Sequence, residues 1–361
     1  MGRAGSGGVI RAILSPRADA GRTAQPRVGR RALLVNLVIA AVTIFFAYFA
    51  VTHIKVEQAW DALRSSEYLW LLPALSAFAA GNVARALRWR SLFAPGRRPS
   101  VGAVLDATIV GYFYNSILPA RAGEAARIVV LRQRSSAPTV EILGTVVIER
   151  LYDLMAVLVI FFVAEPWLPH VSWLKAAAIA AIVLASLIAA AATVLAIYGD
   201  RPVRLLLRPL RRISLVSELR LERAVHELAD GLSGLRRPVV ALEGFAWTIV
   251  AWMLSALCAY FVILAFHLPL SFLCGILVVV AVGLGMIIPS APAAIGVFEG
   301  AALVALKVYG ISYSSALPYA LVLHAVNFLP FLPAGVLLLQ HNARHPKTMT
   351  DTAGVSTAGP G

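Results

Sequence analysis

The segment NSILPARAGEAAR, residues 115–127, interrupts an apolar stretch with a proline, a glycine and three charged residues. Pro119 lacks a backbone N–H and therefore breaks a helix, whereas Gly123 allows the chain to turn. Glu124 and Arg127 are three residues apart, so they share one face of the helix that follows. We predict two half-helices joined by a structural hinge at this proline and glycine.

Basic residues lie on both sides of this segment. Before the apolar stretch 103–118 come five arginines that are interpreted as markers of the cytoplasmic side, Arg85, Arg88, Arg90, Arg97 and Arg98. Arg132 and Arg134 follow the second half-helix. Because Lys and Arg mark cytoplasmic loops, the chain is expected to enter and leave the membrane on the cytoplasmic side. A re-entrant helical hairpin satisfies this condition. Irregular backbone at membrane depth is tolerated only where it is buried in protein or lines a cavity.

The whole chain has the composition of an all-α polytopic membrane protein. Of its 361 residues, 60% are hydrophobic and 14% are charged, and the mean hydropathy is +0.80. Soluble domains have about 25% charged residues. The net charge is +14, and the basic residues lie between the apolar blocks. This arrangement follows the positive-inside rule and argues against nucleic-acid binding. We predict a multi-pass protein of a bacterial-type inner (plasma) membrane with both termini cytoplasmic.

Three parts of the chain are distinguished by composition. Residues 1–31 contain seven arginines and one acid, which predicts a disordered basic tail. Residues 32–340 form the transmembrane domain, and residues 341–361 form a second flexible tail. The loop 200–237, with nine arginines, is expected on the cytoplasmic side. About six full spans are predicted, at 32–52, 69–89, 139–164, 173–198, 239–266 and 316–340.

A second broken segment occurs in the other half of the chain. Two short apolar pieces, 271–288 and 293–309, are separated by IIPSAPAAIG, in which Pro289 and Pro292 unwind the helix and Gly296 starts the next one. This hairpin is expected to enter from outside. Two oppositely oriented hairpins indicate an inverted-topology repeat whose interrupted segments meet near the midplane. The alternative is that each hairpin crosses the membrane fully. The 8–10 hydrophobic segments would then give up to ten short spans.

Charged side chains within the membrane are costly and mark functional sites. In IERLYDLM, Glu149 and Asp153 share one helical face, and Arg150 is turned about 100° away. We expect this group to pair with the first hairpin, for instance Arg150 with Glu124. A structural ion-pair cluster, a proton- or ion-coupling carboxylate and direct ligand contact all remain open. The candidate substrate-binding residues are Asn115, Arg121, Glu124, Arg127, Glu149, Arg150, Asp153 and Glu299.

Two arginines of the first hairpin predict an anion site. Arg121 and Arg127 lie beside a helix N-terminus, which favours a phosphate or carboxylate, and guanidinium binds such groups bidentately. Either arginine could pair with Glu149. The alternative is that both arginines anchor the hairpin to lipid headgroups of the inner leaflet.

The second half offers fewer polar candidates. Glu299 is expected either to cap backbone amides or to face the central cavity, and His324 is expected to be a hydrogen-bonded interior histidine. Cys258 and Cys274 are interpreted as buried apolar residues. We predict no metal, no cofactor and no catalytic residue, since nucleotide-binding glycine loops and a GxSxG nucleophile motif are absent from the sequence.

Four motifs together resemble the lysylphosphatidylglycerol synthase transmembrane-region family, also called the flippase-like domain or UPF0104. They are RALRWRSLF, NSILPARAGEAARIVVLR, VVIERLYD and IPSAPAAIGVFEG, which occur in family order within residues 35–340. The resemblance implies a domain that, in the two-domain multiple peptide resistance proteins, is credited with moving aminoacylated phosphatidylglycerol between leaflets. We expect this chain to lack their C-terminal aminoacyltransferase domain and its activity.

The resemblance also carries over motif positions and shows one departure. The family often has a glycine pair where this chain has Ala293 and Ala294, which is expected to stiffen the turn. The motif positions carried over are Asn115, Pro119, Arg121, Gly123, Glu124, Arg127, Glu149, Arg150, Asp153, Pro289, Gly296 and Glu299.

Three functions are compatible with the sequence. The first is a flippase-like transporter that binds an anionic membrane lipid, either a phospholipid or a polyprenyl phosphate, in an arginine and carboxylate cavity. The second is a membrane enzyme or accessory subunit that acts on lipids or lipid-linked sugars, with Glu149 or Glu124 as the catalytic carboxylate. The third is a scaffold for a partner. A homo-oligomer or a separate synthase partner is compatible with each.

Overall fold

A computed structural model of the chain describes residues 56–93, 95–118, 122–169, 238–286 and 291–344, with scattered positions between 176 and 194. Every regular element within these ranges is helical. The expected N-terminal tail, the first span 32–52, most of the span 173–198, the loop 200–237 and the chain beyond residue 344 lie outside the described residues.

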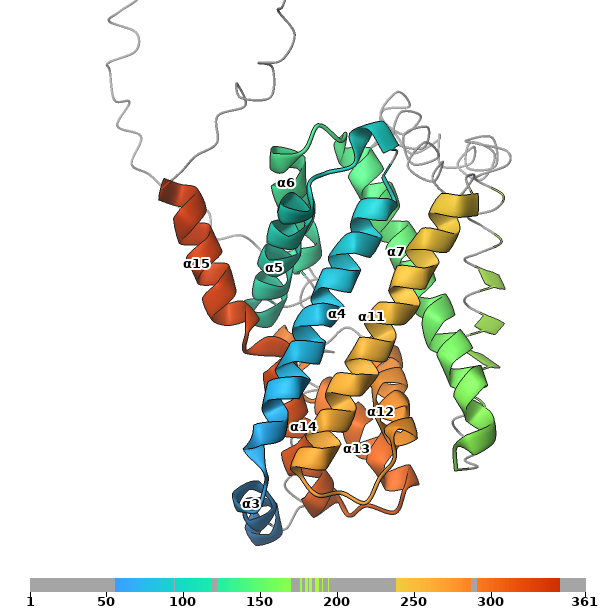
Figure 1. Ribbon diagram of the computed structural model, residues 1–361, viewed down its shortest axis with the longest axis vertical. Helices are drawn as coiled ribbons and strands as arrows, with labels where there is room; N and C mark the ends of the chain where they lie inside the picture. Colours follow the sequence, from blue (N-terminus) through green and yellow to red (C-terminus); the bar gives the residue numbers. More distant parts are fainter. Residues whose placement is uncertain are drawn as a thin grey trace, which may run out of the picture. The chain divides into compact units, whose positions relative to one another are not determined.

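Two long helices form the central pair. The amphipathic helix α3 (Val56–Arg64) and a short 3-10 turn, η1 (Tyr68–Trp70), lead into α4 (Leu71–Ser91). Helix α4 packs along α11 (Pro238–Ala265), and the two run in opposite directions (Figure 1). These helices correspond to the predicted spans 69–89 and 239–266.

The first hairpin consists of α5 (Val101–Ile117) and α6 (Ala122–Arg134), which pack on each other. The Ser100 hydroxyl caps α5 by accepting a hydrogen bond from the Ala103 backbone N–H at 3.2 Å. The helices approach so closely that a Cβ on Gly123 would lie 2.6 Å from Asn115 Oδ1 and would collide with the Gly111 carbonyl. The predicted break therefore occurs where expected, between the two helices.

Helix α7 (Thr139–Ala164) has the bounds predicted for the third span, and the 3-10 turn η3 (Glu165–Trp167) follows it. This helix contacts α4, α6, α11 and α12. Several faces of α7 are therefore covered by other helices, which gives its charged residues partners within the protein.

The second hairpin consists of α12 (Phe272–Gly285) and α13 (Val297–Val308), separated by the 3-10 turn η6 (Pro292–Ala294). Residues 287–290, which include Pro289, lie outside the described residues. Ala293 and Ala294 have φ angles of 56° and 59°, in the left-handed region that favours glycine. The alanine pair therefore adopts strained backbone where the family often has glycine.

The predicted span 316–340 lies within the apolar helical stretch Tyr313–His341, which the structure interrupts to give α14 (Tyr313–Phe328) and α15 (Phe331–Arg344). Pro330 lies at the break, where it cannot donate a backbone hydrogen bond into the preceding turn. Helix α15 continues to Arg344, past the start of the tail expected at residue 341.

The two hairpins lie at opposite ends of the central pair (Figure 1). Helices α5 and α6 lie near the C-terminal end of α4, whereas α12 and α13 lie near its N-terminal end. One hydrophobic core is formed mainly by α11 to α14, and a second by the end of α4 with α5, α6 and the start of α7. At 1.5 Å per residue the four hairpin helices are about 18 to 26 Å long, shorter than a hydrocarbon layer of ~30 Å.

Two helical stretches in the described part of the chain are long and apolar enough to cross a membrane. They are Val239–Ala265 and Tyr313–His341, with mean hydropathies of 2.2 and 1.9, and the second includes the break between α14 and α15. Large apolar side chains such as Val163 and Leu337, each 65% exposed, lie on the outside of the helices. The architecture is that of a helical membrane protein.

Candidate functional site

A cavity of about 240 Å³ lies where the two hairpins meet. Helix α5 contacts η6 there, so the end of the first hairpin reaches the break of the second. Aromatic side chains form part of its wall, with Phe331 stacked on Tyr112 at 4.6 Å between ring centroids and edge-on to Phe78 at 5.4 Å. The charged residues that line it are Arg85, Arg88, Glu124, Glu149, Arg150 and Asp153.

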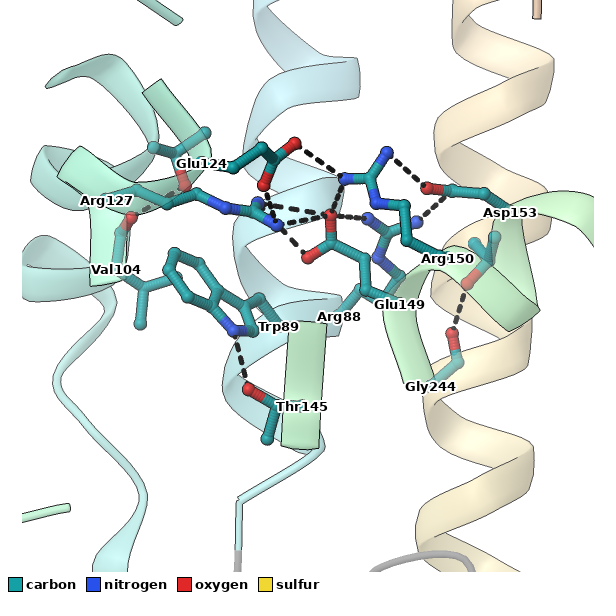
Figure 2. Close-up of polar contacts among 12 residues, drawn as sticks. Arg88, Trp89, Val104, Glu124, Arg127, Thr145, Glu149, Arg150, Asp153 and Gly244 are labelled. Atoms are coloured by element: carbon teal, nitrogen blue, oxygen red, sulfur yellow. Dashed lines mark hydrogen bonds and ion pairs between the residues drawn. The ribbon is translucent and has the colours of Figure 1, made fainter. Parts of the chain in front are cut away.

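Arg88 of α4 is the most deeply buried cation beside this cavity, with 2% of its surface exposed. Its guanidinium forms ion pairs with two carboxylates of α7, Glu149 at 3.1 Å and Asp153. Asp153 also accepts a hydrogen bond at 3.2 Å from the indole N–H of Trp252 on α11. These contacts connect α4, α7 and α11 through one buried group of charges (Figure 2).

Arg127 of α6 lies on the other side of Glu149. Its guanidinium donates two hydrogen bonds to one oxygen of Glu149, at 3.1 and 3.2 Å, and a third to the other oxygen at 3.3 Å. It also pairs with Glu124, one turn away on the same helix, at 2.7 Å. The predicted pairing of Glu149 with a first-hairpin arginine is therefore present.

Arg150 closes the group on the side of the cavity, and 46% of its side chain is exposed. It lies 2.5 Å from Glu149, 3.4 Å from Glu124 and 3.6 Å from Asp153. The predicted pair of Arg150 with Glu124 is thus present. Figure 2 shows all three arginines directed toward the Glu149 carboxylate.

These residues form what we call the six-charge cluster: Arg88, Arg127, Arg150, Glu124, Glu149 and Asp153. Three positive charges face three negative charges, so the cluster is neutral as a whole. Buried charges are tolerated when each is paired, and removing one partner leaves an uncompensated charge at a large energetic cost. The cluster can therefore hold the helices in register and present charged atoms to the cavity at the same time.

For two arginines of the cavity wall, the sequence predicted a different location. Arg85 and Arg88 were interpreted as markers of the cytoplasmic side, but both line the cavity. The correction has a geometric reason: residues three apart share a helical face, and this face of α4 is directed toward α7 and α11. Asn82, Arg85 and Arg88 follow one another at intervals of three residues, and this spacing was the feature of the sequence that indicated a shared polar face.

The first hairpin's hinge is held by Asn115, whose side-chain oxygen accepts a hydrogen bond from the Gly123 backbone N–H at 2.8 Å. Asn115 also lines the cavity. Its amide therefore closes the gap between the end of α5 and the start of α6. Pro119 and Arg121 lie outside the described residues.

Glu299 has a capping role in α13. One carboxylate oxygen accepts a hydrogen bond from the Gly296 backbone N–H at 2.7 Å, and the other lies 2.5 Å from His324 Nδ1. Among the described residues, those lining the cavity do not include Glu299, although its neighbour Phe298 does line it. Of the seven site residues predicted in the first half, the structure brings six into the cavity region or the cluster behind it, and the seventh, Arg121, lies outside the described residues. Glu299 lies beside the cavity.

Pro292 begins η6, and its neighbours Ala291 and Ala293 line the cavity. No group of three His, Cys, Asp or Glu side chains arranged to hold a metal ion occurs in the part of the chain that the structure describes.

Comparison with known proteins identifies the family of membrane proteins to which the chain is related. The chain matches the family described as the lysylphosphatidylglycerol synthase TM region over residues 33–335. It is also similar to a UPF0104 membrane protein of Methanocaldococcus jannaschii, with 26% identity over 226 residues, which cover 63% of this chain and 92% of that protein. The matched range contains both hairpins, the cavity and the six-charge cluster. The chain therefore belongs to the lysylphosphatidylglycerol synthase transmembrane-region family of membrane proteins.

Proposed function

We propose that this protein is a flippase-like lipid translocase, which binds an anionic lipid headgroup in the cavity and moves it between leaflets. The observation that carries the proposal is the charged cavity at the meeting point of two broken hairpins. Charged residues inside a membrane mark substrate or ion pathways, and interrupted helices place binding sites near the midplane.

The hairpins supply the geometry that translocation needs. Each of their four helices is too short to cross a hydrocarbon layer alone, so we infer that both hairpins are re-entrant. One opens from each end of the central pair (Figure 1). Movement of the hairpins in turn would expose the cavity first to one leaflet and then to the other, while the acyl chains stay in lipid.

The distribution of basic residues supports a plasma-membrane orientation with both termini in the cytoplasm. Arg90, Arg97, Arg132 and Arg344 lie at or near the C-terminal ends of α4, α6 and α15, which are at the same end of the structure (Figure 1). Helix α3, which carries Glu57, Asp61 and one arginine, Arg64, lies at the opposite end (Figure 1). The positive-inside rule assigns the basic end to the cytoplasm.

A lipid-modifying enzyme is the competing function, and the contacts of its candidate carboxylates favour transport. Glu149 is 2% exposed, and both of its oxygens are engaged by guanidinium groups. Glu124 is also engaged through both oxygens, by Arg127 and Arg150. Arginine hydrogen bonds hold Glu149, and two ion pairs hold Glu124, which favours a structural role for both carboxylates over proton transfer. Incubation with lipid would give a chemically altered product if the enzyme function were correct.

The translocase is tested in liposomes that contain the purified chain and a headgroup-labelled phospholipid. Val279→Phe adds bulk to the cavity wall, so we expect translocation to fall by about tenfold or more. Val304→Phe is the matched control because Val304 is 42% exposed on α13, and it should stay within about twofold of the unmodified chain. Equal rates in the two variants would remove the cavity from the mechanism, and absence of transport by the unmodified chain would remove the function.

A further inference from the structure

Arg85 is the cavity arginine outside the six-charge cluster. It lies on α4 one turn before Arg88 and is half-buried in the cavity wall. One terminal nitrogen, Nη2, donates a hydrogen bond at 2.7 Å to the hydroxyl of Ser255 on α11. That hydroxyl donates in turn to the Ala251 carbonyl at 3.0 Å. Ser255 therefore fixes the guanidinium through a neutral contact and leaves its charge uncompensated.

The charge balance around the cavity singles out this residue. Arg88, Arg127 and Arg150 each pair with carboxylates, whereas no carboxylate pairs with Arg85 among the described residues. Four arginines thus face three carboxylates, which leaves one positive charge at Arg85. A half-buried cation without a counter-ion attracts an anion from outside the protein, because burial weakens its interaction with water.

The local packing keeps this guanidinium accessible. Gly81 lies one turn before Arg85, and a Cβ at that position would be 3.3 Å from Arg85 Nη1. The absence of a side chain at Gly81 therefore gives the second terminal nitrogen room. With Nη2 held by Ser255, the guanidinium still has free N–H donors, and its planar shape suits two parallel hydrogen bonds to the oxygens of a phosphate.

We propose that Arg85 is the residue that contacts the substrate's phosphate, and that the ligand is a singly charged phosphate diester in a lipid headgroup. This assignment rests on the proposed translocase. One surplus positive charge matches one diester charge, whereas a phosphate monoester or a pyrophosphate would bring negative charge that the cavity does not balance. The six-charge cluster then acts as a neutral wall that fixes the helices, and Arg85 supplies the attraction.

Binding is measured by native mass spectrometry on the full chain in detergent, titrated with phosphatidylglycerol, with phosphatidic acid or with inorganic phosphate. Arg85→Gln should weaken phosphatidylglycerol binding by about 10- to 100-fold, the range expected for losing a hydrogen bond to a charged group. Arg85→Lys should be intermediate because it keeps the charge and loses the planar fork. Arg97→Gln is the control, since Arg97 pairs with Glu141 at 3.5 Å and is 55% exposed.

Gly81→Ala gives a second test that leaves every charge in place. This substitution should weaken phosphatidylglycerol binding by several-fold, which is about the effect of displacing one hydrogen bond. Thermal unfolding should stay close to that of the unmodified chain. Phosphatidylglycerol should bind more tightly than phosphatidic acid. Competition by inorganic phosphate at the same concentration as phosphatidylglycerol would overturn the lipid assignment.

The outcomes separate this assignment from the proposed function. If Arg85→Gln binds phosphatidylglycerol as the unmodified chain does while Val279→Phe still blocks translocation, the role of Arg85 is wrong and the translocase stands. If binding depends on Arg85 but the unmodified chain translocates no lipid, the translocase is wrong and the binding site stands. An unmodified chain that retains no phosphate diester lipid would overturn the assignment of the ligand and leave the translocase to be decided by the liposome assay.

Discussion

The guanidinium of Arg127 lies over the indole of Trp89, with 4.7 Å between its central carbon and the ring centroid. The same indole donates a hydrogen bond at 2.9 Å to the hydroxyl of Thr145 on α7. Trp89 therefore supports the buried cation from below while it connects α4 to α7 (Figure 2). A cation against an aromatic face gains about 0.5 to 2 kcal/mol, more when water is excluded.

This arrangement predicts that Arg127→Ala is strongly destabilising. The substitution leaves Glu149 and Glu124 with fewer positive partners at a buried position, so the free energy of unfolding should fall by about 3 to 5 kcal/mol. Thermal unfolding in detergent measures the change. Arg97→Ala, which removes a 55% exposed cation that lies 3.5 Å from its carboxylate partner, should change stability by less than about 1 kcal/mol. Equal effects of the two substitutions would show that the cluster does not stabilise the fold.

Gly123→Ala is expected to prevent the first hairpin from closing. The added Cβ would overlap the Gly111 carbonyl and the Asn115 side chain, so α5 and α6 could not keep their present separation. We expect the free energy of unfolding, measured by thermal unfolding, to fall by about 3 kcal/mol or more. Gly102→Ala in the first turn of α5 is the control, because a Cβ there meets nothing within 4 Å. It should be neutral or stabilise by up to about 1 kcal/mol.

Replacing the alanine pair of the second hairpin by glycine should stabilise the protein. Ala293 and Ala294 both have positive φ, so Ala293→Gly and Ala294→Gly relieve strain, and the gain should be roughly 0.5 to 1 kcal/mol for each. Ala301→Gly, inside α13, should have the opposite sign and destabilise by about 1 kcal/mol. Thermal unfolding of the three variants checks the signs. Destabilisation by glycine at both turn positions would contradict the strained backbone.

Glu299 is predicted to act through structure. Glu299→Ala removes the acceptor of the Gly296 N–H and the partner of His324, so stability should fall by about 1 to 2 kcal/mol. Glu299→Gln keeps an amide oxygen for the cap and should retain most of the stability and of the translocation rate. A large loss of translocation in Glu299→Gln, with normal thermal unfolding, would place Glu299 in the transport site.

The helix bounds could be predicted because the apolar blocks are long and sharply ended. Helix α7 follows Pro138 and has the bounds that the sequence indicated, and α11 differs from its predicted span by one residue at each end. The break of the second hairpin contains the predicted Pro292 and Gly296, and the first hairpin breaks between Ile117 and Ala122, next to the predicted Gly123. In each case a local signal, a proline, a glycine or a charge, is sufficient to end a helix.

The role of Arg88 could not be predicted in the same way. An arginine near the end of a span can reach the headgroups or turn inward. The spacing of Asn82, Arg85 and Arg88 indicates that they share a helical face, but it does not indicate what that face contacts. The choice depends on Glu149 and Asp153, which α7 brings beside α4 only in the folded protein. The break at Pro330 was visible in the sequence, but the hydropathy of the flanking residues is continuous across it.

The break between α14 and α15 has a mechanical consequence. Helix α14 packs on α13 of the second hairpin, while α15 packs on α5 of the first, where Gly335 leaves space for the ring of Phe113. One continuous segment therefore belongs to both halves of the fold. A tilt of one hairpin relative to the other would therefore change the angle between α14 and α15 at Leu329 and Pro330.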